Sequence, residues 1–313
     1  MRIYHNPVMV QEVLNCLDFK NFEDLGVIID CTLGSGGHSE AILKFAKSIG
    51  KKIKILAVDL DCEGIAIAKK RLKDNLDSMI IRQGNFSQIS NIAKENGLNK
   101  VEAVLFDLGL SSLHLEKSMR GFSFRQDAIL DMRFDRNQTV SASNVVNQES
   151  ENVLKNIIRD FGEEPRAAVI ANFIVKNRPI LSTLKLAAII TRAKKSYRYK
   201  RIHPATQTFQ ALRMHVNNEL NNINLGLKQA ISLLKKTGKI IVISYHSIED
   251  RLVKNILFEE TRECICPRDI LECVCEHSPS LRLVFRKVLK PSIEEVNENR
   301  RSRSAKLRVA ERI

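Results

Sequence analysis

Hydrophobic and polar positions along the first third of the chain alternate between two kinds of pattern. Each of four short β-branched runs predicts a buried strand: 27–31, 53–59, 79–81 and 101–107. Helical patterns near 39–48 and 63–72 lie between them. Alternation of strand and helix at this spacing favours a parallel sheet with helices on both faces.

The pattern changes after the fourth strand. The stretch 111–146 is loop-like and rich in charge, Ser and Asn, whereas apolar residues at helical spacing then predict four helices: 151–160, 166–176, 183–195 and 209–234. A strand is predicted at 239–244 and a helix at 247–260. The run 281–289 alternates like an edge strand, and 305–310 can pair with it. We therefore expect one α/β sheet, built from 1–110 and 216–313, interrupted by an inserted helical domain at 111–215.

Composition narrows the class of protein. A hydrophobic fraction of 44% over 313 residues argues against a mostly disordered chain. The formal net charge of +14 indicates an anionic partner such as nucleic acid or a membrane surface. No signal-peptide pattern or membrane-length apolar run is evident, and the seven cysteines are an odd number. We expect a cytoplasmic protein without a membrane partner; the oligomeric state stays open, a homodimer included.

A glycine-rich run, Asp30-Cys31-Thr32-Leu33-Gly34-Ser35-Gly36-Gly37-His38-Ser39, follows the first strand. Glycines there let the backbone approach a ligand, and the following helix exposes N–H groups at its start. A tight turn with nothing bound is the simpler alternative. The G-x-G-G spacing fits the dinucleotide fingerprint G-x-G-x-x-G poorly. It is more similar to the loop that holds S-adenosylmethionine in Rossmann-like methyltransferases.

Acidic residues follow the second and fourth strands. Asp59 stands where a carboxylate can accept both ribose hydroxyls of an adenosine. Asp61 is a candidate for the same role or for the cap of the next helix. Phe86, just beyond the third strand, is suited to wall an adenine ring or to fill the core.

Asp107 ends the fourth strand and is expected to face the crevice where ligands of such sheets bind. The exocyclic amine of a nucleobase is a poor nucleophile, because its lone pair is delocalised into the ring. An acceptor that holds its N–H groups can direct the lone pair at a methyl carbon. Asp107 is the candidate catalytic residue, with the alternative that it holds the amino-acid end of the cofactor.

Longer motifs run nearly from end to end of the chain. They are His5-Asn6-Pro7-Val8-Met9, Gly34–Ser39, Asp107-Leu108-Gly109, Arg120-Gly121-Phe122-Ser123-Phe124, Leu130-Asp131-Met132-Arg133, Phe161-Gly162-Glu163-Glu164, His203-Pro204-Ala205-Thr206, Ser244-Tyr245-His246-Ser247 and Arg303-Ser304-Ala305-Lys306. With these runs in this order, the chain resembles the bacterial methyltransferases that modify the exocyclic N4 of a cytosine in small-subunit (16S) ribosomal RNA.

The resemblance implies a Rossmann-like, S-adenosylmethionine-dependent methyltransferase sheet with a helical insertion for substrate recognition. It also implies cofactor contacts, at Gly36, Gly37, His38, Asp59, Phe86, Asp107 and His114. The family pattern usually has Gln where His114 stands, and an imidazole does not offer the hydrogen bonds of an amide. That departure puts the His114 contact in doubt.

A basic run is the candidate RNA contact: Lys194, Lys195, Tyr197, Arg198, Tyr199, Lys200 and Arg201. Its cations suit phosphates and its tyrosines suit stacking on bases. A solvated basic loop is the alternative. His246 is a further candidate for contact with the substrate.

Four cysteines cluster near the C-terminus: Cys264, Cys266, Cys273 and Cys275. They can supply four thiolates to zinc. Their C-x-C pairs are less usual than C-x-x-C, and methyl transfer needs no metal. We therefore predict no metal site, and take the cluster as unliganded thiols or a redox-labile pair.

Three other functions compete with a cytosine-N4 methyltransferase. They are an NAD-dependent oxidoreductase, a non-catalytic RNA-binding factor that kept the fold, and a methyltransferase for another nucleobase or for a protein. The G-x-G-G loop counts against the oxidoreductase, and the intact Asp59 and Asp107 count against a factor that has lost catalysis. Only a substrate assay discriminates the third alternative.

Overall fold

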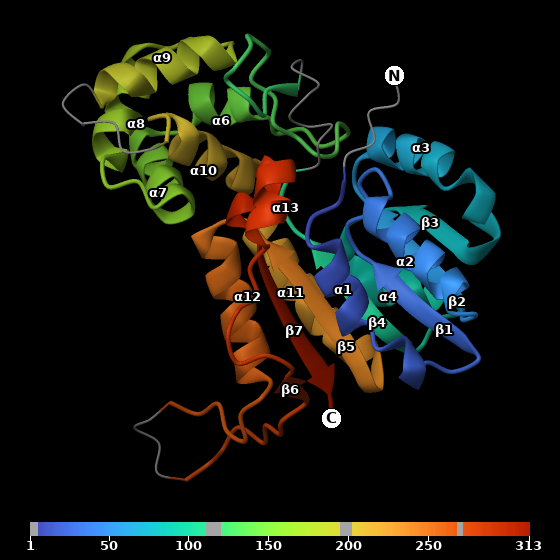
Figure 1. Cartoon of the computed structure of the whole chain (residues 1–313). Coiled ribbons are helices and arrows are strands. Elements are labelled where there is room, and N and C mark those ends of the chain that lie inside the picture. Colours follow the sequence, from blue (N-terminus) through green and yellow to red (C-terminus); the bar gives the residue numbers. More distant parts are fainter. Residues whose placement is uncertain (1–5, 111–119, 195–201, 268–271) are drawn as a thin grey trace. The chain divides into compact units, whose positions relative to one another are not determined.

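The computed structural model describes residues 6–110, 120–194, 202–267 and 272–313 (Figure 1). Contacts within the chain divide it into two compact units. The sheet unit comprises Met1–Gly109 and Leu220–Ile313, and the helical unit comprises Leu110–Glu219. The sequence pattern predicts the corresponding boundaries at 110/111 and 215/216.

The sheet unit contains a seven-stranded sheet of order β3-β2-β1-β4-β5-β7-β6. Its strands are β1 (Leu25–Asp30), β2 (Lys52–Asp59), β3 (Met79–Gln83), β4 (Val101–Asp107), β5 (Leu234–Ser244), β6 (Leu281–Leu283) and β7 (Lys306–Arg312). The first five strands pair in parallel, and β7 runs antiparallel to both β5 and β6. This confirms the predicted Rossmann-like sheet, whose ligand crevice lies beyond the carboxyl ends of the parallel strands.

Helices cover both faces of this sheet, which is why its parallel strands read as continuous apolar runs. Successive residues of a strand point to opposite faces. Ile28 and Leu105 therefore join the core under α1 (Val10–Cys16), α2 (Gly37–Ser48) and α3 (Cys62–Arg71). Ile29 and Phe106 join the core under α4 (Ile89–Glu95), α11 (Glu219–Leu233) and α12 (Ser247–Glu259).

The shorter elements of the sheet unit complete its outline. They are α13 (Ile293–Glu298) and the 3-10 turns η1 (Phe19–Asn21), η2 (Lys73–Ser78), η3 (Phe86–Gln88) and η5 (Arg300–Ser304).

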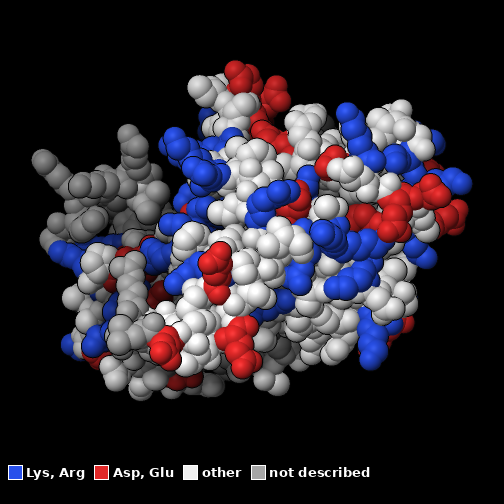
Figure 2. Space-filling view, turned by 90° about the horizontal axis from the view of Figure 1, so that it is seen from below, with Lys and Arg blue, Asp and Glu red and all other residues white. Residues whose placement is uncertain are grey.

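On the face drawn in Figure 2, Lys and Arg side chains are spread widely, with Asp and Glu among them. Among the described residues, no helix has both the length and the apolar character required to span a bilayer.

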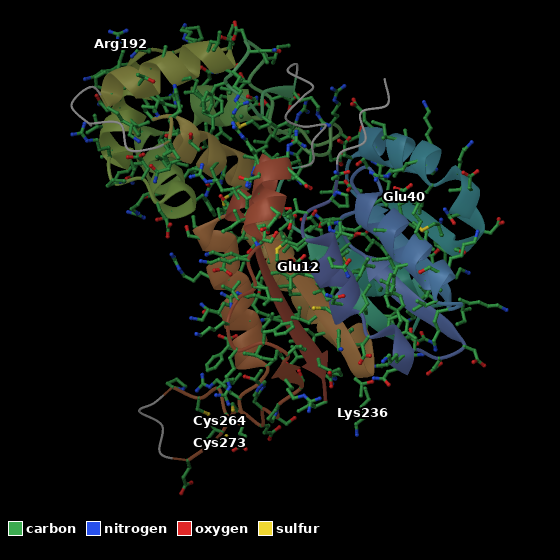
Figure 3. All side chains as sticks on the ribbon, viewed as in Figure 1. Glu12, Glu40, Arg192, Lys236, Cys264 and Cys273 are labelled. Carbon is green, nitrogen blue, oxygen red and sulfur yellow. The ribbon has the colours of Figure 1, made fainter. Side chains whose placement is uncertain are left out.

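A loop that carries Cys264 and Cys273 connects α12 to β6 (Figure 3). Its base is closed by the carbonyl of Glu260, which accepts the N–H groups of Ser280 and Leu281 at 2.8 and 3.0 Å. The loop therefore begins and ends at the same point of the fold.

The helical unit has a hydrophobic core of its own. Its helices are α6 (Ala142–Gln148), α7 (Glu151–Gly162), α8 (Ala167–Lys176), α9 (Thr183–Ala193) and α10 (Thr206–Val216). Serines 141, 150 and 182 cap the starts of α6, α7 and α9 through their side chains, as is usual for helix N-termini.

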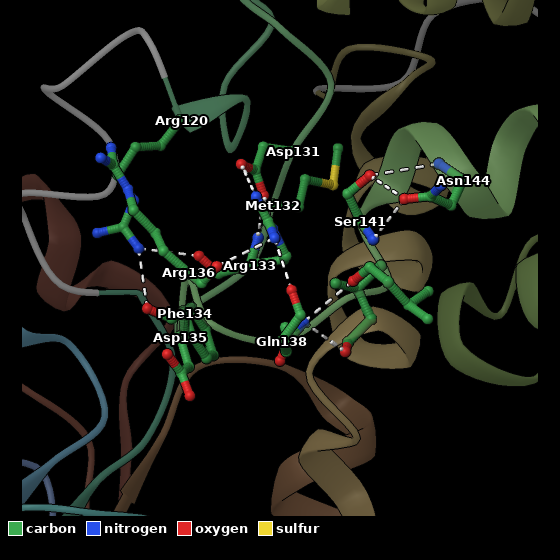
Figure 4. Close-up of polar contacts among 12 residues, drawn as sticks. Arg120, Asp131, Met132, Arg133, Phe134, Asp135, Arg136, Gln138, Ser141 and Asn144 are labelled. Atoms are coloured by element: carbon green, nitrogen blue, oxygen red, sulfur yellow. Dashed lines mark hydrogen bonds and ion pairs between the residues drawn. The ribbon is translucent and has the colours of Figure 1, made fainter.

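Polar side chains brace the irregular segment that precedes α6 (Figure 4). The buried Arg120 donates from Nη2 to the carbonyls of Arg133 and Phe134, at 2.8 and 2.9 Å. Asp131 accepts from Arg133, with 2.6 Å between its Oδ1 and Nε. A segment without a helix or strand must satisfy its backbone polar groups in this way. These motif residues therefore have a structural role in the helical unit.

Four features of the structure differ from the prediction. The predicted helix 209–234 is two helices, α10 and α11, because the chain turns at Asn217 and Asn218, the latter with φ of +50°. The Asn217 side chain donates to the carbonyls of Met132 and Arg213 and so fixes this turn. The strand β5 begins at Leu234, and α6 begins within the stretch predicted to be loop-like. The edge strand ends at Leu283, and Leu289 forms only an isolated bridge with Leu307.

Lys194 does not belong to an exposed basic run. Its side chain is 6% exposed and its Nζ contacts Oε2 of Glu164, whose side chain is 1% exposed. Lys194 also donates to the carbonyl of Pro204 at 3.1 Å. The prediction that it contacts RNA is therefore wrong for Lys194, because its charge is already paired inside the helical unit. The other members of the run, residues 195–201, lie outside the described residues.

We expect Glu164→Ala to destabilise the protein by about 3 kcal/mol, because it leaves the buried Lys194 ammonium without its counter-ion. The midpoint of urea unfolding measures this loss. Asp160→Ala is the matched control, since it removes a carboxylate from the exposed Arg159–Asp160 pair of the same unit and should change stability little. Equal losses in the two variants would contradict a special role for the buried pair.

Candidate active site

The glycine loop between β1 and α2 depends on backbone conformations that favour glycine. Gly34 and Gly36 have φ of +52° and +81°. A Cβ at Gly36 would lie 3.0 Å from Cδ1 of Leu72 and 3.3 Å from Cβ of Ala68. No side chain caps α2. Because the first N–H groups of a helix have no partner within it, this end of α2 is suited to a carboxylate or phosphate of a ligand.

Two carboxylates hold the loop in place. Asp30, which is 1% exposed, accepts from Ser39 Oγ at 2.7 Å and from the N–H of Thr32 at 3.1 Å. Its burial raises its pKa. Asp59 accepts from the N–H of Gly34 at 2.7 Å. A carboxylate can accept about four hydrogen bonds, so the partly exposed Asp59 can brace the loop and still bind a hydroxyl.

Asp61 caps α3, because its Oδ1 accepts from the N–H of Glu63 at 3.1 Å. This favours the capping alternative over a ribose contact for this residue. Phe86 meets Phe106 edge-on, with 5.5 Å between ring centroids. It also packs on α11, where a Cβ at Gly226 would lie 2.7 Å from the ring. Phe86 therefore belongs to the core and is at the same time partly exposed.

Asp107, at the end of β4, is surrounded by polar groups from three other segments. Tyr245 donates from Oη to its Oδ1 at 2.7 Å. His38 Nδ1 lies 3.6 Å from its Oδ2. The Asp107 N–H donates to Thr32 Oγ1 at 2.7 Å. The side chain is 24% exposed, and burial raises its pKa although His38 and Tyr245 act in the opposite direction.

The hydrogen bonds of His38 indicate where a proton lies. Its Nε2 is 2.9 Å from the carbonyl of Val8, and a carbonyl only accepts, so Nε2 carries a hydrogen. In a neutral imidazole, Nδ1 then has a lone pair that faces Asp107. Two facing acceptors repel each other, so the contact is favourable when a proton lies on Nδ1 or on Asp107.

Tyr245 is the site residue that sequence reasoning missed. It directly follows β5, whose register alongside β4 pairs Asp107 with Ile243. A signal existed, because the carboxyl ends of adjacent parallel strands meet at one edge of the sheet. Its ring packs over Gly109, whose φ of +102° favours glycine and where a Cβ would lie in close contact, 3.2 Å from the ring. Burial and the neighbouring Asp107 raise the pKa of Tyr245 well above its usual value, so the phenol remains a donor.

His246, the candidate substrate contact, and His203, a residue of the sequence motifs, both have partners within the fold. His246 caps α12 through Nδ1, and its Nε2 lies 2.8 Å from Oε1 of Glu249. His203 stacks on Phe124, with 4.5 Å between ring centroids, and its Nδ1 accepts from the N–H of Ala205. His114 lies outside the described residues. The structure thus brings Gly36, Gly37, His38, Asp59 and Asp107 together around the carboxyl ends of β1, β2 and β4.

A family model described as the MraW methylase family matches residues 2–313. The chain belongs to this family. It is 47% identical to the ribosomal RNA small subunit methyltransferase H of Dehalococcoides mccartyi, over 99% of this chain and 86% of the relative. It is 44% identical to the protein of the same name from Halothermothrix orenii, over 99% of this chain and 98% of the relative.

A solved structure described as a putative rRNA methylase from Clostridium thermocellum aligns with a TM-score of 0.46 and 12% identity, over 99% of this chain and 100% of the other. The family assignment does not depend on it. Membership of the MraW methylase family confirms that this protein is a methyltransferase. The oxidoreductase alternative is thereby removed.

We expect Asp107→Asn to be more stable than the wild type at neutral pH. Because the folded-state pKa of Asp107 is raised, the stability it contributes is fully present below the ordinary Asp pKa of 3.8 and is lost as pH rises through the raised value. Asparagine keeps an acceptor for Tyr245 but cannot ionise.

Thermal unfolding of the wild type and Asp107→Asn, measured from neutral pH down to 3.8, gives the difference in stability. The stability gain should shrink as pH falls towards 3.8. Asp74→Asn, at a side chain that is 81% exposed, is the control and should show no such trend. A gain for Asp107→Asn that does not vary with pH would refute the role assigned to burial.

Proposed function

We propose that this protein transfers a methyl group from S-adenosylmethionine to the exocyclic N4 of a cytosine in small-subunit ribosomal RNA. The observation that carries the proposal is the match of the whole chain to the MraW methylase family, with curated relatives named ribosomal RNA small subunit methyltransferase H. The position N4 is what the family resemblance in the sequence implies. The site geometry supports it with a carboxylate suited to an amine.

The residues around the glycine loop fit the cofactor. The uncapped start of α2 suits the carboxylate of its amino-acid end. Asp59, partly exposed at the end of β2, suits the ribose hydroxyls. Phe86, at the end of β3, suits one side of the adenine. Gly36 and Gly37 carry no side chain between the loop backbone and a ligand, and a Cβ at either would lie in tight contact, 3.0–3.1 Å from its neighbours.

When bound, the cofactor supplies a methyl group on a sulfonium, which is a good leaving group. The task left to the protein is to orient a weak nucleophile and exclude water. We propose that Asp107 is the catalytic residue and accepts hydrogen bonds from the target amine. Tyr245, as donor to Oδ1, fixes the carboxylate and leaves lone pairs of both oxygens available. The raised pKa of Asp107 suits it to take the proton that the methylated amine releases.

The RNA contacts rest on charge. The net charge of +14 favours a polyanion, and basic side chains are spread over the face drawn in Figure 2. We propose that the helical unit serves substrate recognition, with contacts from Lys195, Tyr197, Arg198, Tyr199, Lys200 and Arg201, and that His246 also touches the substrate. The target base must leave its stack to reach Asp107. We propose that the protein acts in the cytoplasm, since the proposed substrate is ribosomal RNA.

Methyl transfer from labelled S-adenosylmethionine to purified small ribosomal subunits, and separately to naked RNA, tests this function. We expect N4-methylated cytidine, identified by mass spectrometry of the digested nucleosides. Methylation of a different base or of a ribosomal protein would overturn the cytosine assignment. Cofactor binding without transfer to either substrate would favour the non-catalytic alternative.

We expect Asp107→Ala to lower kcat by about 100-fold or more. This is the loss seen when an enzyme is deprived of one preorganised polar group that stabilises its transition state. The affinity for S-adenosylmethionine, measured by calorimetry, should fall far less than kcat, because Asp30 and Asp59 still hold the glycine loop. Asp74→Ala, the loss of an exposed carboxylate, should leave both quantities unchanged. If cofactor affinity were lost while kcat at saturating cofactor stayed at the wild-type value, Asp107 would instead bind the amino-acid end of the cofactor.

A further inference from the structure

The loop between α12 and β6 lacks the usual means of holding a fixed shape. Between Glu260 and Ser280, no helix or strand occurs among the described residues. Two of its apolar side chains face solvent, since Ile265 is 43% and Val274 is 70% exposed. A connection of this length without secondary structure is uncommon in a compact domain and usually has a function. A segment with no core of its own needs a cross-link to keep one shape.

Four sulfur atoms meet in this loop. The Sγ atoms of Cys264, Cys266, Cys273 and Cys275 all lie within 4.8 Å of one another. Cys273 and Cys275 are 3.5 Å apart, and Cys275 and Cys264 are 3.8 Å apart. In Figure 3, Cys264 and Cys273 lie close together in the loop, although they belong to opposite arms of it.

These distances can be compared with the geometry of a metal site and of a disulfide. Zn–S bonds of about 2.3 Å in a tetrahedron place the sulfurs about 3.8 Å apart. A disulfide requires about 2.05 Å, and all four cysteines are free. The cluster therefore has the spacing of a tetrathiolate metal site, and no disulfide joins its sulfurs.

Backbone N–H groups point at three of the sulfurs. Ile265 donates to Cys275 at 3.5 Å, Cys266 to Cys264 at 3.4 Å and Val274 to Cys266 at 3.4 Å. Such donors stabilise negative charge on sulfur and orient metal ligands. The cluster also differs from the free thiols of the core, since none of its members is buried whereas Cys16 and Cys31 are. A free cysteine normally behaves as a small buried hydrophobe.

We propose that Cys264, Cys266, Cys273 and Cys275 bind one Zn²⁺ ion. Four protein thiolates complete a tetrahedron and leave no position for water or substrate, so the site is structural. Each thiol releases its proton to solvent when the metal binds. The ion joins the two arms of the loop and takes the place of a hydrophobic core. The geometry reverses the preference for unliganded thiols that the C-x-C spacing favoured.

Metal analysis of the full-length protein, purified under reducing conditions without added metal, tests the site. We expect one zinc per chain, released when a mercurial reagent modifies the thiols. Cys273→Ser with Cys275→Ser should abolish zinc binding, whereas Cys62→Ser, at an exposed cysteine of α3, should retain it. Stoichiometric iron in place of zinc, or a native disulfide within the cluster, would overturn the proposal.

Cobalt binding provides a test that needs no variant to fold. Titration of Co²⁺ into reduced, metal-free wild-type protein should produce the intense absorption of a tetrahedral tetrathiolate site, and Zn²⁺ should displace it. Chelation should also speed tryptic cleavage after the exposed Arg262. If metal-free protein gives no such spectrum and resists trypsin as well as the native protein, the loop does not depend on a metal.

Discussion

The burial of the Asp107 carboxylate is the constraint on which the rest of the site depends. A charge that is largely removed from water must be offset by hydrogen bonds or by a proton. Tyr245, from the end of β5, offsets it on one oxygen. His38, from the first turn of α2, faces the other oxygen. Three elements are thereby fixed relative to one another by the requirements of one carboxylate.

Hydrogen bonds connect the surroundings of Asp107 to the glycine loop. His38 is held from behind by the carbonyl of Val8, and Thr32 accepts the N–H of Asp107 itself. Asp30, buried beneath the loop, bonds to both Thr32 and Ser39. These hydrogen bonds hold the loop in one conformation in the absence of a ligand. A preformed site of this kind avoids the ordering cost that binding would otherwise meet, and it sets the cofactor loop and the candidate catalytic carboxylate in one network.

The two insertions into the sheet fold are stabilised by different means. The helical unit is large enough for its own hydrophobic core, and its buried Glu164–Lys194 pair is satisfied within that core. The described residues of the loop between α12 and β6 form no such core, and four sulfurs meet among them instead. Size explains the difference, because a short segment cannot bury enough apolar surface to offset its conformational entropy.

The sequence by itself determined the sheet, the helical insertion and the glycine loop, because apolar periodicity and glycine spacing are local signals. It also placed Asp59 and Asp107 at strand ends. Only the tertiary structure showed that Tyr245 joins Asp107, that Lys194 is buried against Glu164 and that the four cysteines of one loop converge. These contacts join residues distant in sequence or depend on the course of an irregular loop. The spacing of apolar residues along the chain therefore does not predict them. The break at Asn217, set by hydrogen bonds to Met132 and Arg213, is hidden for the same reason.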